Sequence, residues 1–411
     1  MNFLTSIKSR IYYGWVVVGA TFLVLFAGFG VVYSFGAFFL ALSVEFGAGR
    51  AAVSSIFSYA VFTLFITGAI SGVIADRSGP KKVMAFGVVA VALGLLGAAN
   101  AEQLWLVNLC FALGVGAGVG FVYIPAISTV QRWFVRRRGL ASGIAVTGIG
   151  VGTMVMPIVA GELLETMTWR TVFSLMSILV LVSGFVAVAL IEADPSDRGL
   201  APDGDNMVSK SATLPEQNLL LWPILRSRSF VQFYLAQAVL SIAIFIPFVH
   251  LVPFAADLSI PRSQAVSIVG LIGLGSTAGR FLVGGVADRI GRRLTLVLLL
   301  AGIAVAYVIW LAANSATTLS IYAFVFGVFY GGYVALIPAL LADYFNGPKL
   351  SSVIGLQYTA SAAGSLLGPI LAGYLFDRTG SYVSALVVAG ICAACASYLI
   401  AVVPAQPTVR A

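Results

Sequence analysis

Long apolar runs separated by short polar segments constrain the fold of this chain more than any other feature of the sequence. Most runs reach about 20 residues, the length that a helix needs to cross the hydrocarbon core of a bilayer. The strands of a membrane barrel would instead alternate polar and apolar residues over about 10 positions, and the runs show no such alternation. Twelve runs occur, at approximately residues 13–42, 52–75, 82–99, 103–131, 139–164, 171–192, 229–256, 264–287, 293–313, 318–344, 351–376 and 381–403. The sequence therefore predicts an all-α membrane protein with twelve transmembrane helices.

The composition excludes a water-soluble domain. Hydrophobic residues make up 60% of the 411 residues and charged residues only 9%, against roughly 45–50% and about 25% in soluble globular proteins. A net charge of +8 would suggest nucleic acid as a partner of a soluble protein, but here we attribute it to membrane topology. Cys110, Cys392 and Cys395 all lie in apolar runs, where cysteine is a small packing residue. We therefore predict no nucleic-acid partner, disulfide, metal or cofactor.

Lysine and arginine are distributed unequally between the two sides of the predicted bundle. When alternate polar segments are assigned to opposite sides, only Arg50, Arg170, Arg262 and Arg378 fall on the side opposite to both termini. Cytoplasmic loops carry the excess of basic residues in membrane proteins. We therefore expect both termini to be cytoplasmic, with the protein in the cell (inner) membrane.

A sequence repeat relates the first part of the chain to the second. The segment GVIADRSGPKK at residues 72–82 recurs as GGVADRIGRR at residues 284–293, and the same offset of 212 residues carries Pro157 onto Pro369. Matches in one register at distant places are typical of transporters built from two structural repeats.

The repeat predicts two six-helix halves, residues 1–192 and 228–411, joined by a polar linker, residues 193–227. The linker is rich in charged and proline residues, so we expect it to be solvated and loosely ordered. A short amphipathic piece is possible around residues 219–225.

Arg280 stands alone in the apolar stretch at residues 266–286. Its guanidinium cannot lose its proton, and an arginine in mid-membrane costs about 2.5 to 3.5 kcal/mol on insertion scales, so it normally faces a cavity and an anion. Counting back from Asp288 at a rise of 1.5 Å per residue places Arg280 roughly 12 Å into the membrane. We predict that it binds an anionic substrate; the alternative is a structural arginine that satisfies backbone carbonyls or a carboxylate.

The repeated segment carries the pattern GxxxDRxG followed by basic residues, after the second and the eighth run. Its members are Gly72, Asp76, Arg77 and Gly79 in the first copy and Gly284, Asp288, Arg289 and Gly291 in the second. Duplicated in a twelve-span chain, this motif resembles the signature of the major facilitator superfamily. The resemblance implies that fold, with the motif acting as a cytoplasmic gate that latches the halves. We expect the glycines to permit close helix packing. The two aspartates end their helices on the unfavourable side of the helix dipole and should need a partner.

Four stretches further resemble the monocarboxylate transporter family within that superfamily. They are YYGWVVV at residues 12–18, FVYIPA at 121–126, RWFVRRRGLASGIAVTGIGVG at 132–152 and GPILAGYLFDRTGSY at 368–382. The resemblance implies that Arg280 matches the family's eighth-span arginine, which binds the substrate carboxylate. Ser276 stands where many members carry an aspartate one turn before that arginine, and the first-span lysine of animal members has no counterpart. The likeness is to a bacterial member with rearranged coupling residues, which leaves the proton carrier open.

Other polar residues at a similar depth are candidates for the substrate site. They are Tyr123, Tyr330, Tyr333 and, more weakly, Gln357; each tyrosine is as readily explained by aromatic packing. His250 lies between Pro247 and Pro253, where broken helical hydrogen bonding can expose polar backbone to a cavity. It is a candidate for substrate contact and for proton carrier, the alternative being a hydrogen-bonded histidine near the outer interface. Asp257 is the second candidate for proton binding.

These residues favour a proton-coupled symporter of small monocarboxylates such as L-lactate or pyruvate, in which two halves rock around a central site. The closest alternative is a carboxylate antiporter of the oxalate and formate type, but a dianion favours a second mid-membrane cation, and the eleventh run has none. A receptor would need a signalling domain, a drug or sugar facilitator an acidic or amide-rich cavity, and an enzyme a nucleophile with its base. Apart from substrate, proton and lipid, we predict no obligatory partner.

Overall fold

The computed structural model describes residues 12–204, 221–345 and 350–404, and these residues are almost entirely helical, with no strand among them. Twelve helical stretches are long and apolar enough to cross a membrane, which confirms the predicted all-α membrane fold. The stretches are Gly14–Phe46, Arg50–Ser78, Pro80–Ala99, Leu104–Trp133, Gly139–Thr166, Trp169–Leu190, Arg228–Asp257, Arg262–Ile290, Arg292–Leu311, Ala316–Tyr344, Ser352–Thr379 and Val383–Ala401.

The first, fourth and seventh stretches are interrupted helices. Their pieces are α2 (Gly14–Tyr33) and α3 (Phe35–Phe46), α6 (Leu104–Cys110), the π-helical η1 (Phe111–Gly116) and α7 (Ala117–Trp133), and α11 (Arg228–Ile244) and α12 (Ile246–Asp257). The break in the seventh follows from Pro247, which has no N–H to donate to the carbonyl four residues earlier. That carbonyl, on Ala243, instead accepts the hydroxyl of Tyr307 at 2.6 Å.

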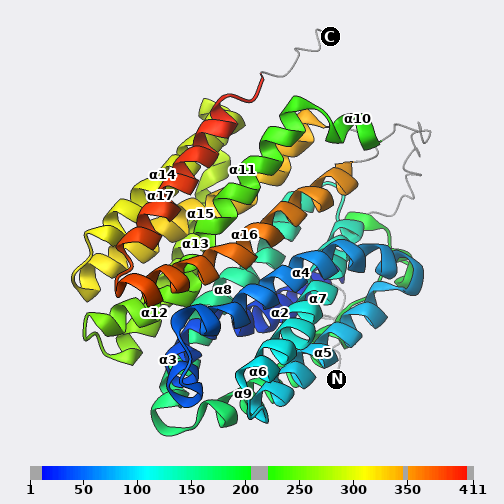
Figure 1. The fold of residues 1–411 in the computed structure, drawn as a ribbon. Helices are drawn as coiled ribbons and strands as arrows, with labels where there is room; N and C mark the ends of the chain where they lie inside the picture. The colour runs from blue at the N-terminus through cyan, green and yellow to red at the C-terminus, as the bar shows by residue number, and fades with distance from the viewer. Residues whose placement is uncertain (1–11, 205–220, 346–349, 405–411) are drawn as a thin grey trace.

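The remaining spans are continuous helices arranged in two groups (Figure 1). They are α4 (Arg50–Ser78), α5 (Pro80–Ala99), α8 (Arg138–Thr166), α9 (Trp169–Leu190), α13 (Arg262–Ile290), α14 (Arg292–Leu311), α15 (Ala316–Tyr344), α16 (Leu350–Thr379) and α17 (Val383–Ala401). Helices up to α9 form the first half and those from α11 onward the second. The halves meet where α4 packs against α16 and where α8 packs against α13.

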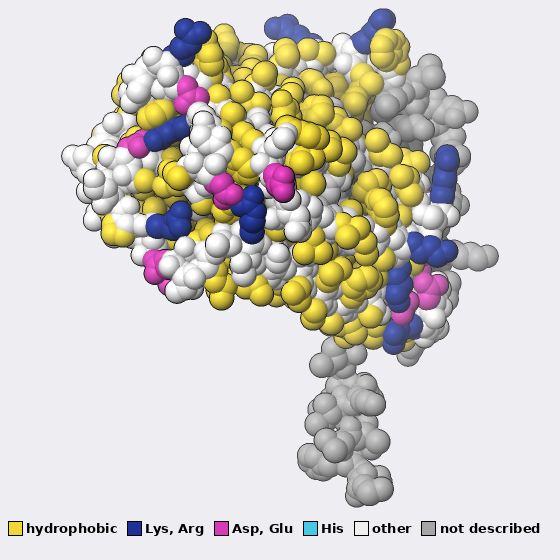
Figure 2. Space-filling model, turned by 60° about the horizontal axis from the view of Figure 1, so that its bottom comes forward, with side chains coloured by type: hydrophobic (Ala, Val, Ile, Leu, Met, Phe, Trp, Pro, Cys, Tyr) yellow, Lys and Arg dark blue, Asp and Glu magenta, His cyan; other side chains and the backbone are white. Residues whose placement is uncertain are grey.

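The outer surface suits a lipid environment. On the face shown in Figure 2, hydrophobic side chains cover much of the surface, and the charged side chains gather in separate groups, one in the left and central part of the view and one at its right edge. Large apolar residues in mid-helix, such as Leu93, Val182 and Phe281, are 62% to 66% exposed. Such exposure is unfavourable in water and expected in hydrocarbon, so the chain is a multi-pass membrane protein.

Contacts between the halves are concentrated at one end of the molecule. We call the end where α9 finishes and α11 begins the linker side, and the opposite end the distal side. On the distal side Arg50 of α4 forms an ion pair with Asp257 of α12. On the linker side, the ion pairs of Arg132 with Asp76 and Asp194 and of Arg292 with Asp343 each stay within one half or the segment that follows it. The ion pair of Arg50 with Asp257 therefore places a link between the halves on the distal side.

The glycines of the repeated motif shape turns more than they permit helix packing. Gly79 and Gly291, which follow α4 and α13, both have a φ of 89°, a conformation that L side chains adopt only under strain. Gly72 has Ile124 at 3.2 Å from the position of an added Cβ, whereas Gly284 has no atom within 4 Å of that position. Close packing was therefore a correct expectation for Gly72 and a wrong one for Gly284.

The two aspartates of the motif differ in their partners. Asp76 forms an ion pair with Arg132 of α7 at 2.9 Å. The position that the repeat relates to Arg132 holds Tyr344, and Asp288 is exposed, with no ion pair to any described residue. The expectation that both need a partner is thus met in the first half and wrong in the second, because an exposed carboxylate is stabilised by water.

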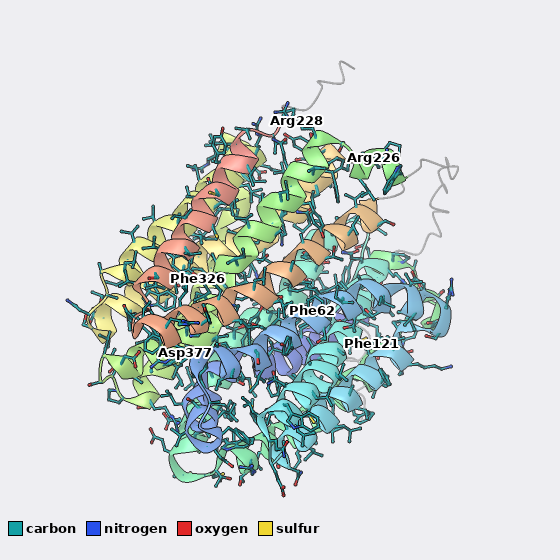
Figure 3. All side chains as sticks on the ribbon, in the orientation of Figure 1. Phe62, Phe121, Arg226, Arg228, Phe326 and Asp377 are labelled. Carbon is teal, nitrogen blue, oxygen red and sulfur yellow. The ribbon has the colours of Figure 1, made fainter. Side chains whose placement is uncertain are left out.

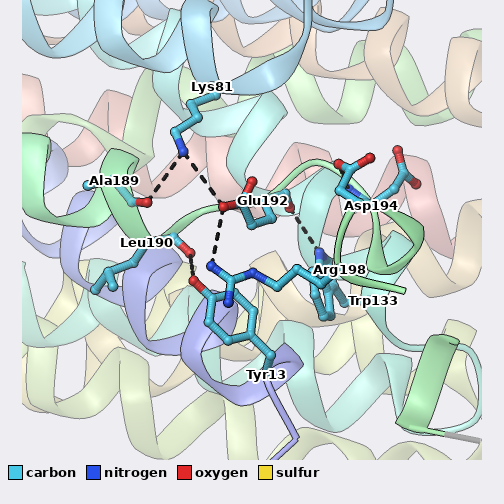
Figure 4. A network of polar contacts seen from close by, with 9 residues as sticks. Tyr13, Lys81, Trp133, Ala189, Leu190, Glu192, Asp194 and Arg198 are labelled. Carbon is cyan, nitrogen blue, oxygen red and sulfur yellow. Dashed lines mark hydrogen bonds and ion pairs between the residues drawn. The ribbon is translucent and has the colours of Figure 1, made fainter. Parts of the chain in front are cut away.

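The segment that follows α9, residues 191–204, is docked on the first half. The expectation of a loosely ordered linker covered residues 193–227, of which 205–220 lie outside the described residues. Figure 4 shows that the hydroxyl of Tyr13 donates to the carbonyl of Leu190 and the indole of Trp133 to that of Glu192, both at 2.9 Å. The guanidinium of Arg198 lies over the Tyr13 ring at 3.6 Å and reaches the Glu192 carboxylate at 3.4 Å. Aromatic and charged side chains of the first half therefore hold the start of the linker.

Two short 3-10 helices, η2 (Pro195–Arg198) and η3 (Pro202–Gly204), continue this docked segment. In η3, Asp203 accepts the backbone N–H groups of Val135 at 2.9 Å and Arg136 at 2.8 Å. The short helix α10 (Leu221–Leu225) falls within the predicted amphipathic piece, whose first residues, 219 and 220, lie outside the described residues.

Candidate functional site

Arg280 lies on α13 where the two halves touch in mid-helix. Its side chain is half-buried, and its Nη1 donates to the carbonyl of Val146 on α8 at 2.9 Å. Its Nε is buried and has no hydrogen-bond partner among the described residues. A buried donor without an acceptor costs about 1 to 3 kcal/mol. A backbone carbonyl therefore satisfies part of the guanidinium, while Nε is left for an acceptor from outside the chain.

Small residues bring α13 close to its neighbours and so fix the position of Arg280. Gly279 faces the carbonyl of Val328, and Gly331 of α15 faces that of Ser276, at distances that leave no room for a Cβ. Backbone packed against backbone holds the helix rigidly. Ser276 itself is 3% exposed, and its hydroxyl has no partner among the described residues.

Tyrosines from both halves gather around Arg280. The hydroxyls of Tyr33 on α2 and Tyr330 on α15 are 3.4 Å apart, across the interface between the halves. The hydroxyls of Tyr123 on α7 and Tyr358 on α16 also interact with each other. The guanidinium interacts electrostatically with Tyr33, Tyr123 and Tyr330. One fixed cation is thus surrounded by phenol groups that can donate hydrogen bonds to an anion.

Phenylalanine rings pack against these tyrosines. Phe29 lies edge-on to Tyr123 with ring centroids 5.2 Å apart. Phe248 of α12 lies 4.4 Å from the Tyr33 ring and 5.8 Å from the Tyr330 ring. Apolar walls with a few directed polar groups are typical of small-molecule sites. The arrangement suits a small anion that carries an apolar part.

Tyr333 and Gln357 do not join this cluster. Tyr333 is 4% exposed and donates its hydroxyl to the side-chain oxygen of Gln237 on α11. Gln357 is 2% exposed and donates to the carbonyl of Phe233 at 2.8 Å. Both side chains point into the packing of the second half, between α11, α15 and α16. Their hydrogen bonds are made within the second half and not with Arg280.

His250 lies in the distal contact between the halves and is fully buried. Its Nδ1 is 2.9 Å from the hydroxyl of Tyr382, and its Nε2 is 2.8 Å from the carbonyl of Pro369 and 3.0 Å from the hydroxyl of Ser54. The ring therefore bridges α12 and α16 of the second half to α4 of the first. The structure does not bring it to Arg280, so it is not a substrate contact in this arrangement.

Asp257 lies at the distal end of α12 and is paired. Its two carboxylate oxygens accept the two terminal nitrogens of Arg50 at 2.6 Å and 2.8 Å. Arg50 in turn donates to the hydroxyl of Tyr382 at 2.7 Å. Asp257 and His250 thus belong to one polar network that crosses the interface between the halves.

The sequence model of the Major Facilitator Superfamily matches residues 20–254 and 233–411 of this chain. The chain belongs to the Major Facilitator Superfamily. It is therefore a membrane transporter rather than an enzyme.

Curated relatives of this transporter match it over most of its length. Monocarboxylate transporter 13 of Rattus norvegicus is 28% identical over 382 residues, which are 92% of this chain and 86% of that protein. Monocarboxylate transporter 11 of Mus musculus is 28% identical over 397 residues, 94% of this chain and 85% of that protein. Monocarboxylate transporter 12 of Xenopus laevis is 26% identical over 405 residues, 92% of this chain and 86% of that protein.

Three residues that form polar contacts between the halves are absent from the sequence predictions of site residues. Tyr33 lies in an apolar run with no other feature to distinguish it, although its depth would have suggested it. Arg50 was interpreted only as one of the few basic residues on the distal side. Tyr382 begins the last span and matches the end of the eleventh-span pattern. Their roles depend on contacts between the halves, which lie far apart in sequence.

Proposed function

We propose that this transporter is a proton-coupled symporter of short-chain monocarboxylates such as L-lactate and pyruvate. The observation that carries the proposal is the buried Nε of Arg280, a cationic donor without an acceptor, among phenol groups where the halves meet. A carboxylate would supply that acceptor, and hydrogen bonds between charged groups are the strong ones. The relatives named monocarboxylate transporters support the same substrate class.

A single fixed cation favours a monocarboxylate over a dicarboxylate. Among the described residues of α16, the only basic side chain is Arg378, at the distal end of the helix. A second carboxylate near Arg280 would lose its water without gaining a partner, at a cost of several kcal/mol. The aromatic walls instead suit a short aliphatic chain.

Alternating access is the transport mechanism that we propose. With the halves held together on the distal side, a substrate bound at Arg280 would exchange with the linker side. Rocking of the halves about the central site would then open the distal side. The excess of basic residues on the linker side supports its assignment to the cytoplasm, with both termini inside. The repeated motif, with Asp76 and Asp288, would latch that side when it closes.

His250 is the proton carrier that we propose. Asp257 has both carboxylate oxygens engaged by Arg50 while the distal side is closed. Histidine changes charge within the physiological pH range, and His250 is buried between the halves. A proton bound there would offset the charge of the substrate carboxylate.

The test is uptake of labelled L-lactate into proteoliposomes that contain the purified protein, with and without an inward proton gradient. Unlabelled pyruvate should compete, oxalate and succinate should not, and a protonophore should abolish accumulation. Liposomes with the Arg280→Gln variant control for leakage of the protonated acid through lipid.

Strong inhibition by oxalate, with exchange that does not depend on the proton gradient, would instead assign a carboxylate antiporter. Uptake equal to that of liposomes without protein, for every monocarboxylate tried, would exclude the proposed substrate class.

A further inference from the structure

Arg50 joins the first half to several groups of the second. Its side chain is 15% exposed and is held by the two oxygens of Asp257 and by the hydroxyl of Tyr382. Its guanidinium also lies 3.6 Å from the centre of the Phe376 ring. Bidentate pairing with a carboxylate and stacking on an aromatic ring both strengthen the contacts of an arginine. All these partners belong to the second half, so Arg50 holds the distal side closed.

The backbone at the start of α4 is held by the second half as well. The carboxylate of Asp377 accepts the N–H groups of Arg50 and Ala51, each at 2.9 Å. Figure 3 places Asp377 at the distal end of α16, at the opposite end of the molecule from Arg226 and Arg228. A carboxylate at a helix N-terminus satisfies free N–H groups and favours the helix dipole. The helix cap of α4 is thus supplied from across the interface.

The hydrogen bonds of His250 define which of its nitrogens carries the proton. The carbonyl of Pro369 can only accept, so Nε2 must be the N–H that donates to it. In the neutral ring Nδ1 is then an acceptor, and it receives the hydroxyl hydrogen of Tyr382. The oxygen of Tyr382 in turn accepts the N–H of Arg50. The hydrogen bonds of the closed contact are thus those of a neutral His250.

Protonation of His250 would reverse the hydrogen bond between its Nδ1 and the Tyr382 hydroxyl. With a hydrogen on Nδ1, the imidazolium and the Arg50 guanidinium would both donate to the single oxygen of Tyr382, whose own hydrogen would lose its acceptor. Two cations would then face each other in a buried setting. The other charged groups that face His250 are Asp257, engaged by Arg50, and Asp377, engaged by the N-terminus of α4. Ser54 donates to the carbonyl of Arg50 and adds no charge.

We propose that Arg50, Tyr382, His250 and Asp257 form a distal latch that is closed when His250 is neutral and released when His250 is protonated. Acid on the distal side would thus expose the central site to the compartment from which proton and substrate enter together. The latch rests on the proposed proton coupling. It adds to that proposal the role of Arg50, whose contacts with the second half are released when His250 is protonated.

An ion pair on the same side provides a matched control. Arg170 of α9 donates to the carboxylate of Glu45 on α3 and stacks on Trp169. Its chemistry resembles that of Arg50, but both partners lie in the first half. Replacing Arg170 should leave the contact between the halves unchanged.

The experiment measures the distance between spin labels on the distal ends of the two halves. Cys110, Cys392 and Cys395 are replaced by alanine, and labels are attached after Glu102→Cys and Asn314→Cys, two exposed sites between spans. The distance is recorded for the full chain in nanodiscs without substrate, between about pH 8 and about pH 4. It should increase on acidification in the parent protein and in Arg170→Gln. It should be large throughout in Arg50→Gln and Asp257→Asn, and small throughout in His250→Gln.

A distance that ignores pH in the parent protein, or that responds fully in His250→Gln, would overturn the latch. Tyr382→Phe keeps the ion pair and removes only the shared oxygen, so its pH response should be strongly reduced; a full response would exclude this route. The measurement needs no substrate. A failed uptake assay with an intact pH response would therefore contradict the proposed function alone, and proton-driven uptake with an unresponsive distance would contradict the latch alone.

Discussion

The two ends of the molecule use similar polar groups for opposite purposes. On the distal side Arg50 connects the halves through Asp257 and Tyr382. On the linker side Arg132 connects Asp76 at 2.9 Å and Asp194 at 3.5 Å, all within the first half and its docked linker segment. The distal arginine therefore determines how the halves lie relative to each other. The linker-side arginine stabilises one half as a unit that can move.

The contrast extends to burial. The side chain of Arg50 is 15% exposed and that of Arg132 is 31% exposed. Asp257, the partner of Arg50, is 40% exposed, and Asp76, the partner of Arg132, is 70% exposed. Exposed pairs contribute about 0 to 1 kcal/mol, and more where the arginine is bidentate, as Arg50 is. The distal contact of Arg50 therefore opposes rocking of the halves more than the linker-side contact of Arg132 does. A protonation switch that acts on the distal contact would have the larger effect on the conformation.

The largest effect is expected at Arg280, which lies between the two ends. Arg280→Gln should reduce L-lactate uptake at least about a hundredfold, since a buried charge pair is lost at a cost of about 3 kcal/mol. Arg280→Lys should also be severely impaired, because lysine lacks the planar fork. The distal label distance should not change. Wild-type uptake by Arg280→Gln would make Arg280 a structural residue.

Arg262→Gln is the control for that prediction. Arg262 also lies on α13, and its Nη1 also donates to a carbonyl of α8, that of Leu164 at 3.4 Å. It lies at the distal start of the helix, away from the tyrosines. Uptake by Arg262→Gln should stay within about twofold of the parent, since a single long hydrogen bond at the distal end of the helix contributes about 1 kcal/mol or less.

The twelve spans and the expected depth of Arg280 follow from the sequence because both are obtained by counting residues along the chain. The length of an apolar run predicts a span, and counting residues from Asp288 predicts the depth of Arg280. Depth does not determine direction. Tyr330 and Tyr333 are one turn apart, yet the first interacts with Tyr33 of the other half and the second with Gln237 of its own.

Contacts between the halves could not be predicted from one sequence. Arg50 and Asp257 are separated by 207 positions, and their pairing depends on how two six-helix units pack. The docked linker was missed for a related reason. Its charged composition predicts a solvated segment, but Asp203 finds backbone N–H groups on the loop before α8. The composition of a segment predicts how well water solvates it. It does not predict which surface of the protein the segment contacts.

A second prediction separates coupling from closure at the distal end. His250→Gln should flatten the dependence of L-lactate uptake on the proton gradient severalfold while retaining part of the exchange, because glutamine does not titrate in this range. Asp257→Asn should lower uptake by releasing the latch but keep its dependence on the gradient. If Asp257→Asn flattens the dependence and His250→Gln does not, the carrier is Asp257. A steep response in both variants would mean that the proton travels on the substrate or at another site.

A third prediction compares the two arginines directly. Arg132→Gln removes the exposed pairs with Asp76 and Asp194, worth up to about 1 kcal/mol, so uptake should fall less than about fivefold. The distal label distance should match that of the parent at every pH, in contrast to Arg50→Gln. A widened distal distance in Arg132→Gln would show that the two ends are not independent and would break the comparison.

The smallest effect is expected at Asp203, which holds the docked linker on the first half. Partial burial tends to raise the pKa of Asp203, but the backbone N–H groups of Arg136, Val135 and Arg137 lower it below its usual value. A carboxyl with a lowered pKa in the folded state stabilises the fold above its unfolded pKa, and this contribution is lost as the pH falls through the folded pKa.

Asp203→Asn should therefore lower the thermal unfolding midpoint near neutral pH by about 1 °C, a small value because the group is largely solvent-screened. The difference from the parent should vanish in acid. Asp288→Asn, at an exposed carboxylate without an ion pair to a described residue, should show no such difference. An Asp203→Asn midpoint that follows the parent's at every pH would mean that the docked segment adds nothing to the stability of the first half.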